Sequence, residues 1–84
     1  HEASAAADLP TLTQWRLFRF FDGRGAYAKA EDALYPLLDE APAYLEHGLD
    51  FYERLQRLPD HALEQGGLPR AEVEAALADL RARQ

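Results

Sequence analysis

Apolar residues recur at three- and four-residue intervals along most of this chain, which is the spacing of one face of an α-helix. The pattern predicts helices over residues 11–22, 26–39 and 42–57, a short helix near 60–64, and a last helix that opens at Leu68-Pro69. Glycine and proline clusters separate these segments. We therefore predict four main helices and one short helix, joined by tight turns.

The first predicted helix has more apolar positions than one packed face needs. Leu17, Phe18 and Phe21 form its expected inward stripe, and the stripe is widened by Leu12, Trp15 and Phe20. We place its start at Pro10-Thr11, because proline is favourable at a first helical position. Residues 1–10 are then an N-terminal lead-in, frayed or helical, without a packing pattern of its own.

The later helices have narrower apolar faces. In the last helix we expect Val73, Ala76, Leu77 and Leu80 to point inward. Pro36 lies inside the second helix, where it removes a backbone hydrogen bond, so we expect a kink or an irregular turn there.

The composition agrees with an all-α fold of antiparallel helical hairpins. The chain has 84 residues, enough for one small domain, and its β-branched residues are limited to Thr11, Thr13 and Val73. It has no cysteine, so neither a disulfide nor a thiolate zinc site is expected.

The stretch Gly23-Arg24-Gly25 is compatible with two structures, a phosphate-binding loop and a turn between two helices. A phosphate-binding loop of the G-x-G-x-x-G type follows a strand and needs a third glycine, but here the preceding residues are helical in pattern and the third position is Ala28. A turn between two packed helices requires only glycine at the helix end. We therefore expect a helix–helix turn.

Residues 11–44 resemble one tetratricopeptide repeat. The matching positions are Leu17, Phe21, Gly25, Tyr27, Ala30, Leu34, Leu37 and Pro42. They correspond to apolar positions of a first helix, a Gly-x-Tyr turn, a small residue where the two helices touch, further apolar positions, and a closing proline. The resemblance implies a right-handed array of helical hairpins that binds other proteins or peptides.

The rest of the chain follows the repeat less closely. Phe18 stands where the repeat usually has a small residue, and Trp15 is one position from the usual aromatic place. A second unit begins at Phe51, but residues 59–68 add a short helix and a double-glycine turn. We therefore expect a single domain over residues 1–84 with a degenerate, longer hairpin over 45–84. This second half also resembles small, uncharacterised bacterial helical domains.

Charge is segregated along the sequence. Residues 30–53 contain seven acids and no lysine or arginine, whereas residues 15–29 contain four basic residues and one acid. The net charge of −6 argues against nucleic acid or an anionic membrane as the main partner, since either requires a continuous basic face. No apolar stretch approaches the roughly 20 residues that are needed to cross a membrane. We expect a cytoplasmic protein.

No set of residues predicts catalysis. His47 shares a helical turn with Glu46 and Asp50, but a metal site needs three or four convergent ligands. Ser4, the one serine, has no histidine near it in the sequence. We expect neither an enzyme nor a bound metal or cofactor.

The predicted function is a non-catalytic protein–protein interaction module, in which the chain also self-associates through its aromatic first helix. By the resemblance, the partner-binding residues are Leu12, Trp15, Arg16, Arg19 and Asp22. Tryptophan and arginine often dominate interface energies. The alternative is a structural or regulatory helical domain without a ligand groove. The position of Trp15 separates the two: burial within the chain opposes a groove, and exposure favours a partner.

Overall fold

The computed structural model describes the backbone of residues 2–84 and the side chains of residues 11–84. This part of the chain is helical without any strand, which confirms the all-α class. Its elements are α1 (Glu2–Gly23), α2 (Tyr27–Glu40), the 3-10 turn η1 (Pro42–Tyr44), α3 (Leu45–Gln56), α4 (Asp60–Gln65) and α5 (Arg70–Ala82).

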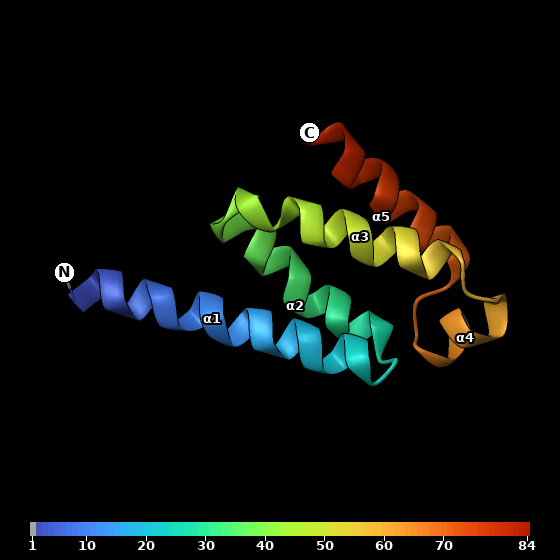
Figure 1. The fold of residues 1–84 in the computed structure, drawn as a ribbon, viewed down its shortest axis with the longest axis horizontal. Coiled ribbons are helices and arrows are strands. Elements are labelled where there is room, and N and C mark those ends of the chain that lie inside the picture. The colour runs from blue at the N-terminus through green and yellow to red at the C-terminus, as the bar shows by residue number, and fades with distance from the viewer. Residues whose placement is uncertain (1) are drawn as a thin grey trace.

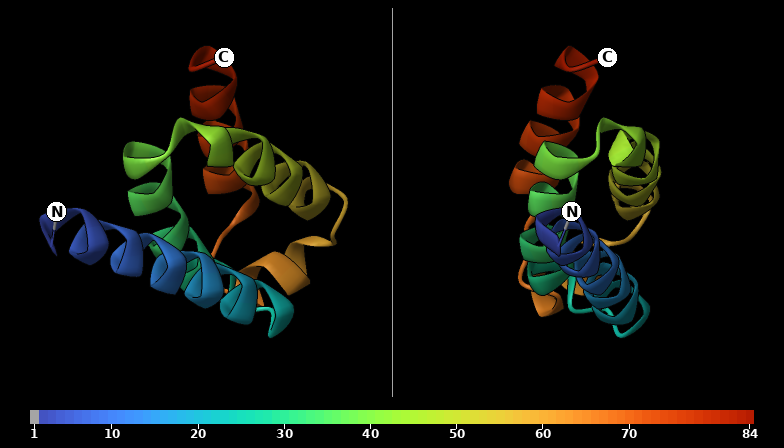
Figure 2. Two further views of the ribbon diagram at one scale, coloured as in Figure 1. Left: turned by 60° about the vertical axis from the view of Figure 1, so that its left-hand side comes forward. Right: turned by 90° about the vertical axis from the view of Figure 1, so that its left-hand side faces the viewer.

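The helices form two antiparallel hairpins (Figure 1). In the first, α1 packs along α2, and in the second, α3 packs against α5. The short helix α4 lies in the connection between α3 and α5, close to the turn between α1 and α2 (Figures 1 and 2). The N-terminal end of α1 projects beyond the other helices (Figure 1).

The predicted start of the first helix was wrong. α1 begins at Glu2 and continues through Pro10 instead of starting at Pro10-Thr11. Residues 3–7 are mostly alanine, the strongest helix former, and a proline removes a single backbone donor from a helix that continues on both sides. Pro36 likewise lies within α2, which extends to Glu40.

The buried core is built mainly from α2, α3 and α5. The four residues predicted to face inward on α5 are all buried. α1 contributes a single buried side chain among residues 11–23, Phe18, whose ring meets that of Phe51 edge-on at a centroid distance of 5.0 Å. Leu17, predicted beside it, is 38% exposed. Neighbouring residues on a helix point about 100° apart, so Phe18 takes the inward direction and Leu17 does not.

The two glycine turns touch each other. Gly25 ends the first turn with a φ of +75°, and its carbonyl oxygen lies against Gly66, in the turn between α4 and α5. The backbone N–H of Ala28 donates to the carbonyl of Gly66 at 2.8 Å. A Cβ atom on Gly66 would stand 2.4 Å from Cδ2 of Tyr27 and 2.6 Å from the oxygen of Gly25. The absence of a side chain at Gly66 therefore permits this contact.

Arg70 links the start of α5 to the end of α3. Its guanidinium donates from Nη1 to the carbonyl of Gln56 at 2.9 Å and from Nη2 to the carbonyl of Leu58, and Nε pairs with Asp60 at 2.6 Å. The last carbonyls of a helix have no partner within the helix. Arg70, at the start of α5, therefore caps the end of α3 and fixes the entry to α4.

We expect Gly66→Ala to lower the free energy of unfolding by about 1–3 kcal/mol, since the new methyl group must displace backbone as well as the Tyr27 ring. Urea denaturation followed by circular dichroism measures the loss. Gly23→Ala is the matched control, because a Cβ there meets nothing within 4 Å. Equal stabilities for the two variants would contradict the turn-to-turn contact.

We expect Arg70→Ala to cost about 1–3 kcal/mol, because it leaves the carbonyls at the end of α3 without their donors. Arg70→Lys should recover part of this stability, since it restores the charge without the fork of donors. The control is Arg57→Ala, which removes an exposed arginine that has no ion pair within residues 11–84. A loss at Arg70 no larger than that of the control would rule out the cap.

Candidate functional site

The side of α1 that faces away from the core exposes large apolar side chains. Leu12 is 44% exposed, Leu17 38% and Phe20 53%, and no other large hydrophobic residue is exposed among residues 11–84. Leu12, Arg16 and Phe20 follow one another at four-residue intervals and therefore share one side of the helix. We call Leu12, Arg16, Leu17 and Phe20, with Arg19 and Arg24 at the edges, the outer face of α1.

The charges on this face are all positive. Arg16, Arg19 and Arg24 have no carboxylate within ion-pair distance in the described side chains, whereas Arg54, Arg70, Arg81 and Arg83 each have one. The guanidinium of Arg24 lies 5.2 Å from the ring centroid of Phe20, and that of Arg19 lies 5.6 Å from Trp15. The outer face therefore combines apolar surface with cations that the described fold leaves unneutralised.

The structure divides the five predicted partner-binding residues into two groups. Leu12, Arg16 and Arg19 lie on the outer face or its edge. Trp15 and Asp22 point instead toward the second hairpin. The Trp15 ring is half-buried within its own chain, with centroids 5.2 Å from Tyr44 and 4.8 Å from His47.

Asp22 forms an ion pair that ties α1 to α3. Its two carboxylate oxygens accept from Nη1 and Nη2 of Arg54 at 3.1 and 2.7 Å. These hydrogen bonds, more than any other influence, raise the pKa of Arg54 above its ordinary value. Two parallel bonds of this kind fix orientation as well as distance. Asp22 thus has a role within the fold, and a role in partner binding stays a prediction.

A shallow hollow lies beside the outer face, between α1 and α2. Its volume is about 250 Å³, and its lining is Gln14, Leu17, Phe21, Lys29, Asp32 and Ala33. Leu17 belongs to both the hollow and the outer face. An apolar side chain of a bound molecule could therefore enter the hollow while the rest of that molecule covers α1.

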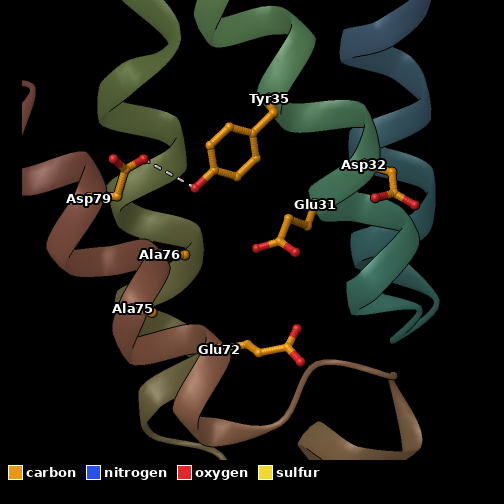
Figure 3. A pocket seen from close by; sticks show the side chains of 7 residues that line it. All are labelled: Glu31, Asp32, Tyr35, Glu72, Ala75, Ala76 and Asp79. Carbon is orange, nitrogen blue, oxygen red and sulfur yellow. Dashed lines mark hydrogen bonds between the residues drawn. The ribbon is translucent and has the colours of Figure 1, made fainter.

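A second, acidic pocket of about 460 Å³ lies between α2 and α5 (Figure 3). Glu31 from α2 and Glu72 from α5 point into the space between the helices, and the hydroxyl of Tyr35 donates to Asp79 at 3.4 Å (Figure 3). The described residues contain no group of three or more histidine, cysteine or acidic side chains that could hold a metal ion.

Glu31 in this pocket accepts the hydrogen bond of a buried tyrosine hydroxyl. Tyr52 is fully buried, and its hydroxyl donates to Oε2 of Glu31 at 2.6 Å. Burial raises the pKa of Glu31 from its ordinary value of 4.5, with Glu72 and Asp32 adding to the increase, although the Tyr52 hydrogen bond opposes it. Burial, and then the hydrogen bond to Glu31, raise the pKa of Tyr52. We interpret the pair as structural, because a buried tyrosine hydroxyl needs a partner.

The pattern of the sequence predicts neither a special role for Glu31 nor the exposure of Leu17 and Phe20. The excess width of the apolar stripe was the signal for an exposed side of α1, since a helix at the edge of a small core can bury one face only. No comparable signal marked Glu31, which stands among other acids in the sequence.

Residues 3–84 match a family described as a family of unknown function, DUF6483. The chain belongs to this family. No curated protein and no solved structure matches this chain. The DUF6483 assignment covers both hairpins and names no activity. In the described part of this DUF6483 protein, no helix is long and apolar enough to cross a membrane.

We expect Glu31→Gln to stabilise the protein increasingly as the pH rises. A carboxyl group whose pKa is raised on folding contributes its full stability below the unfolded value, near pH 4.5, and loses it as the pH passes through the folded value. Glutamine keeps an acceptor for Tyr52 but carries no charge. Urea denaturation of both proteins between about pH 4 and pH 7 measures the difference.

The control is Glu74→Gln, which removes an exposed carboxylate from α5. A stability difference between the Glu31→Gln variant and the unmodified protein that stays constant, or shrinks, as the pH rises would contradict the interpretation.

Proposed function

We propose that this DUF6483 protein is a non-catalytic protein–protein interaction module and that the outer face of α1 is its contact surface. The observation that carries the proposal is the concentration on one helix of the exposed apolar side chains Leu12, Leu17 and Phe20. Exposed apolar surface with arginines around it is typical of interaction sites.

We further propose that the first hairpin is of the tetratricopeptide type. Two features support this interpretation: α1 and α2 pack as an antiparallel pair, and Ala30, the small residue of the repeat pattern, is fully buried. In repeats of this type one side of the hairpin serves as a binding surface.

The alternative, a structural or regulatory helical domain without a groove, has support of its own. Trp15 and Asp22 make contacts inside the chain, to Tyr44, His47 and Arg54. By the criterion set from the sequence, this half-burial opposes a groove centred on Trp15. It leaves the outer face, on another side of α1, available.

Site-specific photocrosslinking in the native cells tests the proposal. A photoreactive amino acid at Leu12 should give discrete adducts with one or a few other proteins, which mass spectrometry identifies. The same group at Glu74, exposed on α5, is the control position. Identical adducts at both positions, or none at Leu12, would favour the structural alternative.

A further inference from the structure

Symmetric pairing of two copies through α1 is opposed by Arg16. An antiparallel contact centred on Arg16 places Leu12 of one copy against Phe20 of the other, which suits the apolar side chains. It also places Arg16 next to Arg16 of the second copy. Neither arginine has an acidic neighbour among the described side chains, so the two like charges meet as water is excluded.

A helix with acidic residues in the middle of its apolar stripe removes this conflict. We propose that the outer face of α1 binds an acidic amphipathic helix of another protein, a proposal that rests on the function proposed above. Leu12 and Phe20 contact the apolar residues of the partner helix. Arg16, between them, pairs with a glutamate or aspartate, and Arg19 and Arg24 face further acids at the edges.

The dimensions of the face suit a helix. Leu12 and Phe20 are eight residues apart, or roughly 12 Å along the axis, which is about two turns of a partner helix. Helices commonly bind through apolar residues repeated at three- and four-residue spacing. The hollow beside Leu17, of about 250 Å³, can receive one of these side chains.

Extended anionic surfaces suit the molecule less well. A membrane or a duplex nucleic acid presents negative charge over a wide area, and this chain has a net charge of −6. The acids Glu31, Asp32, Glu72 and Asp79 line the pocket between α2 and α5. A single helix, roughly 10 Å wide, can contact the positive face alone.

A displayed peptide library tests the inference. The peptides are about 16 residues long and carry leucine on one helical stripe. The central position of this stripe and the positions that flank it are randomised among glutamate, lysine, glutamine and serine. The whole chain and its variants are the targets. Arg16→Glu reverses the central charge, Phe20→Ser removes an apolar contact, and Arg57→Glu makes the same charge change on an exposed residue of the second hairpin.

The unmodified chain and Arg57→Glu should enrich glutamate over lysine by about tenfold at the central position of the stripe, and Arg16→Glu should reverse the preference at this position. Phe20→Ser should lower the affinity of a selected acidic peptide by about tenfold in fluorescence anisotropy. Circular dichroism should show each variant folded, because Arg16, Phe20 and Arg57 are all exposed.

Several results would overturn the inference: no enrichment of acids, an equal effect of Arg57→Glu, binding to phosphatidylserine vesicles that Arg16→Glu abolishes, or a dimer in sedimentation that Phe20→Ser dissociates. Adducts with another protein at Leu12 but no acidic selection would leave the interaction function standing and reject the acidic helix. Absence of adducts at Leu12 would reject the function itself.

Discussion

The contact between the two glycine turns determines how the hairpins meet. The Ala28 N–H reaches the carbonyl of Gly66 because no Cβ separates the Gly66 backbone from Tyr27 and Gly25. This contact sets the turn before α5 beside the start of α2, so that α5 lies against α3 and leaves the acidic pocket between itself and α2. Arg70 holds the opposite end of the same connection by capping α3. Specific contacts therefore hold both ends of the connection between α3 and α5.

One side of α1 packs against the second hairpin and the η1 turn. Phe18 packs on Phe51, Trp15 on Tyr44, and Asp22 pairs with Arg54, all of them contacts with the second hairpin or the η1 turn before it. The opposite side exposes Leu12 and Phe20 and carries arginines that have no acidic partner among the described residues. In a protein with fifteen acids, such a surface gives the molecule a positive, apolar side distinct from the rest. This asymmetry underlies both functional proposals.

The acidic pocket has a different origin. Tyr52 is among the largest side chains of the core, and the burial of its phenol requires an acceptor, which Glu31 supplies. Glu31 in turn lies near Glu72 and Asp32, and the resulting rise in its pKa follows from burial more than from these neighbours. Perturbed carboxyl groups often mark active sites, but structural pairs perturb pKa values as well. Here the hydrogen bond to Tyr52 accounts for the position of Glu31.

The helices, most of their bounds, the helix–helix turn at Gly25 and the buried side of α5 could be predicted from the sequence, because helix propensity, periodicity and glycine conformation are local properties. The sequence did not determine how α1 faces its neighbours. Apolar residues lie around most of that helix, so periodicity leaves its rotation open. The rotation of α1 is fixed by contacts with residues that are distant in sequence: Phe18 packs against Phe51, and Asp22 pairs with Arg54. Leu12, Arg16 and Phe20 form an outer face because those contacts use the other side of α1.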